Sequence, residues 1–113
     1  MSFAEIIDGL SNTFMAGEKH VPLGRFGIGW FDSSIYNGNY TPPTCRAAGP
    51  DAPLAPSPAY YERDMPAVFG SYHPGLCQFV YCDGSVHALR VNTEPKTLGL
   101  LACRNDGLAI PEY

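Results

Sequence analysis

A predicted β-hairpin around Asp83-Gly84 constrains the fold of this chain more than any other feature of its sequence. Residues 78–82 (Gln-Phe-Val-Tyr-Cys) are rich in strand-forming side chains, and an Asp-Gly pair is a strong signal for a tight turn. Residues 85–91 then largely alternate polar and apolar side chains, which is typical of a returning strand. His73, followed by Pro-Gly, marks the entrance to the first strand. We therefore expect the chain to build its sheet on this hairpin.

The composition indicates a small, loop-rich domain. The chain has 113 residues, with 11 prolines, 12 glycines and only 16% charged residues. This balance favours short strands over a helical bundle. We expect one α+β domain over residues 1–113, mostly antiparallel β-sheet with one or two short helices and a long irregular loop. The net charge of −4 gives no basic footprint for nucleic acid. Because neither a signal peptide nor an apolar run of membrane-spanning length is found, the chain as given is expected to be soluble.

Local periodicity predicts the elements of the N-terminal part. Residues 3–7 carry apolar side chains at helical spacing. Residues 13–18 are predicted to form a strand with Phe14 and Ala16 on the same face. In residues 26–31 glycines alternate with large apolar side chains, which favours a strand that packs closely against aromatic rings.

A short helix is predicted near the C-terminus, over residues 97–103. Thr97 is a suitable N-cap, because its hydroxyl can accept a hydrogen bond from the first helical turn. Leu98, Leu101 and Ala102 recur at helical spacing, so we expect these side chains to face the core.

The segment 32–66 has no periodicity and contains most of the prolines. A structureless excursion of this length is usually functional or tethered by a cross-link. Its aromatic residues, together with the single tryptophan just before it, are candidates for a binding surface: Trp30, Tyr36, Tyr40, Tyr60 and Tyr61.

The four cysteines leave two interpretations open. An even number in a small, loop-rich chain permits two disulfides among Cys45, Cys77, Cys82 and Cys103. Cys77 and Cys82 are five residues apart on a predicted strand and should point to opposite faces, so each would pair with Cys45 or Cys103. Alternatively, all four are buried free thiols. A zinc site is disfavoured because the sequence contains no Cys-x-x-Cys pair.

Three motifs in this order resemble a known bacterial family. The first runs from Asp8 through Ser11-Asn12-Thr13 to Gly17-Glu18, the second is His73 followed after nine residues by Asp83-Gly84, and the third is the closing segment 98–107. Together they resemble the prepilin-type family defined by His, nine residues and Asp-Gly.

This resemblance implies a pseudopilin-like architecture. Such proteins carry a cleaved prepilin leader and a long apolar helix before a β-rich globular head. The present chain shows neither leader nor helix, so we expect it to correspond to the head, either trimmed or as a shortened relative. A membrane connection would then depend on the missing N-terminal helix. The resemblance places the protein in the periplasm or on the cell surface.

The spacing of His73 and Asp83 predicts two separate roles. An extended strand between them would span roughly 30 Å at about 3.3 Å per residue. Asp83 is expected to hydrogen-bond within the turn while Gly84 takes a positive φ. His73 is expected to bond across the strand entrance to the loop 8–13, in which Asp8, Ser11 and Asn12 are turn residues.

Two kinds of metal site are alternatives to this structural interpretation. One combines His73 with Asp8, Glu18 or His20. In the other, oxygen ligands such as Asp8 and Asp83 would suit Ca²⁺. The resemblance also implies this ion, because some pseudopilin heads bind Ca²⁺. No spacing in the sequence requires a metal, and we otherwise expect no cofactor.

The sequence thus predicts a non-enzymatic structural subunit of an exported or cell-surface assembly, with protein partners through self-association or through pilin-like subunits. The alternative is a module that binds a small ligand or a glycan with its loop aromatics. A small hydrolase using His73 and an acid is disfavoured, because no nucleophile stands in a recognisable context.

Overall fold

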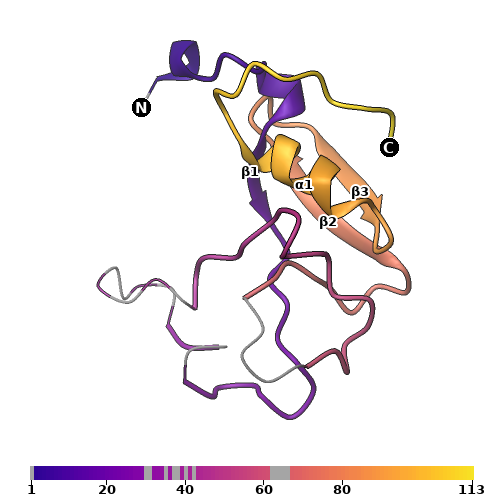
Figure 1. Cartoon of the computed structure of the whole chain (residues 1–113). Helices are drawn as coiled ribbons and strands as arrows, with labels where there is room; N and C mark the ends of the chain where they lie inside the picture. The colour runs from indigo at the N-terminus through magenta and orange to yellow at the C-terminus, as the bar shows by residue number, and fades with distance from the viewer. Residues whose placement is uncertain are drawn as a thin grey trace.

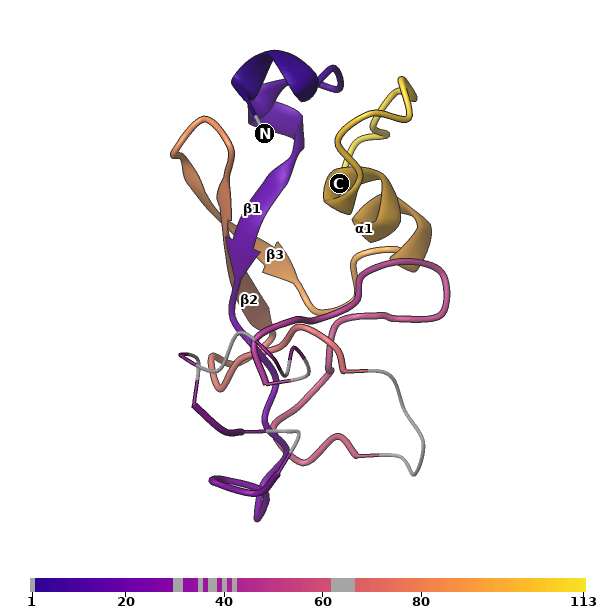
Figure 2. The same ribbon diagram turned by 90° about the vertical axis from the view of Figure 1, so that its left-hand side faces the viewer.

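Three antiparallel strands in the order β1-β2-β3 form a sheet that is covered on one side by a helix (Figures 1 and 2). The computed structural model of the chain describes residues 2–29, 32–34, 36, 39, 41, 43–61 and 67–113. Its elements are the 3₁₀ helices η1 (Phe3–Glu5) and η2 (Leu10–Asn12), the strands β1 (Phe14–Gly17), β2 (Leu76–Tyr81) and β3 (Val86–Arg90), and the helix α1 (Pro95–Ala102). The predicted α+β class, mostly sheet and loop, is confirmed.

The predicted hairpin is present as β2 and β3. Leu76 pairs with Arg90 at one end and Val80 with Val86 at the other. The connection is longer than the Asp-Gly pair suggests, because Tyr81 and Ser85 flank three residues. The Gly84 amide donates to the Tyr81 carbonyl at 2.9 Å, and Gly84 has φ 85°. This is the three-residue connection in which glycine takes the left-handed position.

Strand β1 contains a bulge, and its side chains therefore face other directions than the sequence predicts. Phe14 pairs with Tyr81, whereas Ala16 pairs with Val80, so one extra residue stands between them. A bulge shifts the alternation by one residue. Phe14 therefore points toward the core and stacks on Phe79 with ring centroids 4.1 Å apart, while Ala16 is exposed. The prediction that both face the same way is wrong.

Helix α1 packs on the inner face of the sheet and supplies two fully buried leucines. It begins at Pro95, which suits the first helical turn, where an amide hydrogen has no partner. Leu98 and Leu101 are buried as predicted, but Ala102 is exposed. The predicted N-cap is also wrong, because Glu94 caps the helix and Thr97 lies inside it. The main core cluster comprises Leu54, Cys77, Phe79, Tyr81, Leu89, Leu98 and Leu101.

The segment predicted as a long loop is irregular where it is described, yet it is fastened to the sheet domain. Leu54 belongs to the main core. Ala52 and Ala55 form a second buried cluster with Val68. The Ala55 amide donates to the carbonyl of Phe69 at 2.9 Å. These contacts hold the segment in place without a cross-link.

Two other sequence predictions differ from the structure. Residues 26–29 form turns with exposed side chains, so the strand predicted over 26–31 is absent from its described part. Gly27 and Gly29 have positive φ, which interrupts a strand. Within residues 3–7, the helical part is limited to the single 3₁₀ turn Phe3–Glu5, and of the apolar residues of this segment only Ile6 is buried. Within the described residues, no helix is long and apolar enough to cross a membrane.

We predict that Gly17→Ala destabilises the fold by about 1–3 kcal/mol, because the new methyl group overpacks the core. A Cβ atom at Gly17 would lie 2.5 Å from the ring of Phe79. That ring is held between Phe14 and Phe69, so it has little room to move. Urea denaturation measures the difference, with the exposed Ala16→Ser as the control. Equal stability of G17A and A16S would contradict this packing.

Candidate functional site

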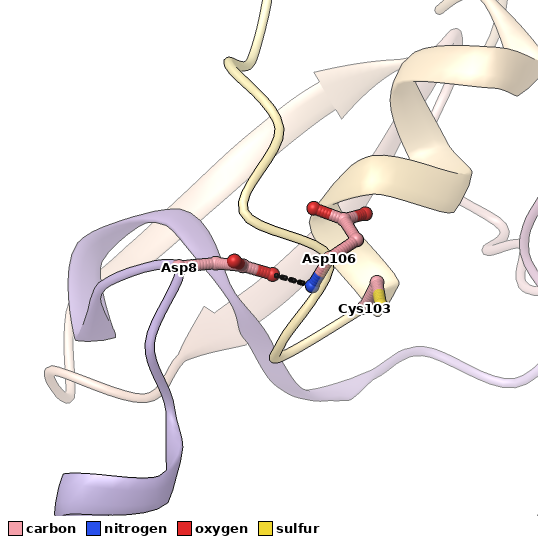
Figure 3. A group of neighbouring side chains, drawn as sticks. All are labelled: Asp8, Cys103 and Asp106. Atoms are coloured by element: carbon pink, nitrogen blue, oxygen red, sulfur yellow. Dashed lines mark hydrogen bonds between the residues drawn. The ribbon is translucent and has the colours of Figure 1, made fainter.

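Asp8 fastens the C-terminal segment to the N-terminal loop (Figure 3). Its two carboxylate oxygens accept hydrogen bonds from the amides of Asp106 and Gly107, at 3.0 and 2.7 Å. The Asp8 amide in turn donates to the carbonyl of Arg104 at 3.3 Å. Hydrogen bonds to a charged acceptor are among the stronger ones. Asp8 therefore joins two chain segments nearly one hundred residues apart in sequence.

The same place holds a group of side chains with metal-binding atoms. One ligand atom each from Asp8, Cys103 and Asp106 lies within 4.8 Å of the other two. Figure 3 shows Cys103 at the end of α1 beside the two aspartates. Both Asp8 oxygens already accept amide hydrogen bonds, and an oxygen of Asp106 accepts one from Leu108. The distances alone would allow a bound cation. Because the carboxylate oxygens already accept these hydrogen bonds, we interpret the three residues as stabilising the C-terminal loop.

The loop that contains Ser11 and Asn12 supports the tip of the hairpin. The Asp83 amide donates to the carbonyl of Leu10 at 3.0 Å, and the Cys82 amide donates to that of Thr13 at 2.9 Å. Asn12 stabilises the loop itself, because its side-chain amide donates to the Asp8 carbonyl. Ser11 lies exposed in η2. The first and second sequence motifs therefore meet in space.

Asp83 organises the hairpin turn through Ser85. One carboxylate oxygen accepts hydrogen bonds from the Ser85 hydroxyl at 2.5 Å and from the Ser85 amide at 2.8 Å. These two donors hold the pKa of the Asp83 carboxyl below its usual range. The Ser85 oxygen also lies 2.9 Å from Nε2 of His87, whose ring packs against Tyr81.

His73 pairs with Glu18 at the other end of β2. Nε2 of His73 lies 3.3 Å from one Glu18 oxygen, and the other oxygen accepts the amide hydrogen of Gln78 at 2.7 Å. Glu18 therefore joins the end of β1 to the start of β2. The expected contact of His73 with the loop 8–13 is replaced by this pair. Of the metal ligands proposed with His73, Glu18 is beside it, whereas Asp8 bonds the C-terminal loop.

A pocket of about 360 Å³ has Glu18 in its lining. Lys19 and Asp32 form an ion pair in its wall, with Nζ 2.8 Å from the carboxylate oxygen. That lysine and the Gly27 amide together keep the pKa of Asp32 below its usual range. The full lining consists of Glu18, Lys19, Val21, Phe26, Asp32, Gly70, Ser71 and Tyr72.

His20 is buried and neutral. Its Nε2 lies 2.7 Å from the Tyr60 carbonyl, so this nitrogen carries the proton and donates. Nδ1 is buried and has no hydrogen-bond partner among the described residues. Burial lowers the pKa of the ring, against the opposing effect of the bond to Tyr60. His20 is therefore a packed core histidine in this structure.

The disulfide interpretation is not supported, because all four cysteines are free thiols. Cys77 is completely buried in the main core, and this burial raises the pKa of its thiol to about 12. Such a thiol does not ionise at neutral pH and is unreactive. Cys45 is exposed in the loop, and Cys82 and Cys103 are half-buried.

The described loop tyrosines do not form one shared platform with each other. Tyr36 is almost fully exposed, whereas Tyr60 packs on the cluster around Val68. The guanidinium of Arg25 lies over the ring of Tyr61, 4.5 Å from its centroid. Trp30 and Tyr40 lie outside the described residues.

Sequence reasoning missed the residues that line the pocket beside Glu18. Phe26 falls in a segment that was expected to be a strand, and Lys19 directly follows the strand predicted over residues 13–18. Asp32 and Tyr72 carry no local signal, because they are brought to Lys19 and Phe26 by tertiary contacts. Only a three-dimensional arrangement reveals this group.

The fold and these sites define a small α+β domain whose motif side chains fasten loops to a three-stranded sheet. A family model described as a protein of unknown function (DUF1559) matches residues 1–96. The chain therefore belongs to the DUF1559 family, a bacterial family associated with prepilin-type N-terminal cleavage and methylation, which confirms the family resemblance; the closing motif 98–107 lies outside the matched residues. Neither the curated proteins nor the solved structures include a significant match to the chain.

We predict that Asp8→Asn releases the C-terminal segment. The variant loses the charge of the acceptor for two backbone amides, and such bonds contribute about 1–3 kcal/mol. Hydrogen exchange of residues 104–113 should accelerate, and the free energy of unfolding should fall by a similar amount. Asp51→Asn is the matched control, because Asp51 is exposed in a turn of the loop segment. Unchanged exchange in D8N would show that the carboxylate does not hold this segment.

We predict an acid-sensitive contribution from His20. Because burial lowers its folded-state pKa below the ordinary 6.5, the unfolded chain binds the proton more readily. Stability should therefore be full above about pH 7 and decrease as the pH falls below the unfolded pKa. His20→Asn removes the titrating group, so the dependence on pH between about 7 and 5 should become shallower in urea denaturation. An equally steep dependence in H20N would assign the effect to other groups.

Proposed function

We propose that this domain is a non-enzymatic structural subunit of an exported assembly and that it binds a second copy of itself through the outer face of its sheet. The observation that carries this proposal is the composition of that face. One-sided antiparallel sheets normally present polar side chains to water. Here the outward positions of the three strands are mostly apolar, and Gln78 and Arg90 are the polar exceptions. The apolar outward residues are Ala16, Leu76, Val80, Val86 and Ala88.

No described element covers this face. Helix α1 lies on the opposite side of the sheet (Figure 2). Val86 is 65% exposed, and Leu76 is exposed as well. A shallow depression of about 250 Å³ lies beside Val80 and Val86. Exposed apolar surface that is continuous across several strands is typical of a protein contact site.

Among the described residues no strand pairs with the outer edge of β3, which favours a second copy as the occupant. The bond between Tyr81 and Ser85 fixes the hydrogen-bond alternation, so the backbone amides of Val86 and Ala88 point away from β2. An unpaired edge next to an apolar face is a template for another strand. A two-fold pair of copies presents the same surface twice, so it can bury both apolar faces against each other or pair both edges of β3.

The motif side chains support a structural role because their polar atoms are engaged within the chain. Asp8 and Glu18 accept backbone amide hydrogens, and Asp83 accepts those of Ser85. The Ser85 hydroxyl donates its hydrogen bond to Asp83. The contact of His87 with Ser85 therefore needs the ring nitrogen as the donor, so His87 does not act as a base toward Ser85. This arrangement is the reverse of an activated serine.

The family supports the exported location. Association with prepilin-type cleavage belongs to proteins that reach the periplasm or the cell surface, and we extend that location to this chain. Pilin-like subunits with a similar exposed face are the second kind of partner that this proposal allows.

We predict that Val86→Glu weakens self-association, because it places a charge on the apolar face. Sedimentation velocity over a range of concentrations measures the change, and we expect the association constant to fall at least about tenfold, or about 1.4 kcal/mol. Ile7→Glu is the matched control, because Ile7 is 68% exposed but lies near the N-terminus.

A second variant tests the strand edge separately. Ala88→Pro removes an amide hydrogen that faces away from β2, so it blocks edge pairing while the hairpin ladder keeps its bonds. A wild-type chain that stays monomeric at all concentrations, or a dimer that V86E and A88P leave intact, would refute self-association through this face.

A further inference from the structure

We propose that the pocket beside Glu18 binds the ring of an uncharged saccharide, with Phe26 and Tyr72 as its stacking surface. The pocket is a concave site of about 360 Å³ formed by three separate segments. These are the residues that follow β1, the segment that carries Phe26 and Asp32, and residues 70–72. The volume is in the range of small-molecule sites.

The two aromatic side chains are held in place although both are largely exposed. Phe26 is 58% exposed and Tyr72 is 48% exposed. Their rings meet edge to face with centroids 5.8 Å apart, and the Tyr72 hydroxyl donates to the carbonyl of Val21 at 3.1 Å. Fixed aromatic surface in contact with water is pre-organised for a flat apolar partner, such as the C–H face of a sugar ring.

The loop that presents Phe26 is fixed by Asp32. The Gly27 amide donates to one Asp32 oxygen at 3.0 Å, and the Asp32 amide donates to the Ile28 carbonyl at 3.3 Å. The other oxygen of Asp32 pairs with Lys19. The position of the Phe26 ring is therefore tied to the polar wall of the same pocket.

The charged groups of the pocket already have hydrogen-bond partners, which favours an uncharged ligand. Lys19 pairs with Asp32, and Glu18 pairs with His73 and with the Gln78 amide. An anionic or cationic ligand would have to compete with these pairs. Carboxylate oxygens keep lone pairs for accepting hydrogen bonds, and an ammonium group has three protons to donate. A sugar hydroxyl both donates and accepts, so it can bond to either group without separating the pairs.

An apolar protein side chain fits this pocket less well than a sugar does. Burying such a side chain against Lys19, Glu18 and Asp32 would desolvate charged groups without offering them hydrogen bonds. A saccharide covers the aromatic rings with its C–H face and meets the charged groups with its hydroxyls.

The test is binding of the whole chain to a printed array of uncharged hexose, pentose and N-acetylhexosamine oligosaccharides, followed by calorimetric titration with the best-bound oligosaccharide. Phe26→Ala and Tyr72→Ala should each weaken binding about tenfold or more, because each removes one stacking contact. Tyr36→Ala is the matched control, because Tyr36 is 92% exposed and does not line the pocket. Amide spectra of F26A and Y72A establish that both variants are folded.

Three results would overturn the proposal. The first is that no uncharged oligosaccharide on the array binds. The second is that one binds but folded F26A and Y72A retain wild-type affinity, which would place the site elsewhere. The third is that acidic glycans, printed on the same array for comparison, are the only ones that bind.

Discussion

The packing of Phe79 in the middle of β2 is the contact on which the rest of the structure depends. Its ring stacks on Phe14 from β1 and meets Phe69 edge to face. Gly17 lies against it where no side chain would fit. One ring thus brings together β1, the central strand and the segment before the hairpin. The bulge in β1 follows from this arrangement, because it lets both Phe14 and Gly17 face the ring.

A chain of this size buries one modest core. Hydrogen bonds to carboxylates add stability at the periphery. Asp8 holds the C-terminal segment, Asp83 shapes the hairpin tip, and Glu18 joins two strands. Each carboxylate accepts backbone amides, which would otherwise have to find water or another acceptor. Buried cysteine acts here as a small apolar side chain rather than as a cross-link, as the unreactive thiol of Cys77 shows. The fold is therefore closed by hydrogen bonds at its edges and by aromatic packing at its centre.

The hairpin and the C-terminal helix could be predicted from sequence because their signals are local. Asp-Gly marks the turn, and the spacing of Leu98 and Leu101 marks the buried helix face. The bulge at β1 could not be predicted, since it is decided by Phe79 more than sixty residues later. The partner of His73 was likewise hidden, because Glu18 reaches it only through the pairing of β1 with β2. The pocket beside Glu18 depends on three segments meeting, and for that reason its aromatic residues carried no signal in the sequence.

The two proposed surfaces follow from one asymmetry of the sheet. Aromatic rings and α1 fill the inner face, so the motif carboxylates form their hydrogen bonds at the ends of the sheet. The outer face is the surface for which we propose a partner. Apolar residues on that outer face stay uncovered, whereas the exposed rings of Phe26 and Tyr72 sit beyond the end of β1 among paired charges. An apolar strip beside an edge that no described strand pairs with suits another protein surface, and fixed rings beside hydrogen-bonded charged groups suit a hydroxyl-rich ligand. Because the strip and the pocket are built from largely different residues, self-association and saccharide binding can occur in the same molecule.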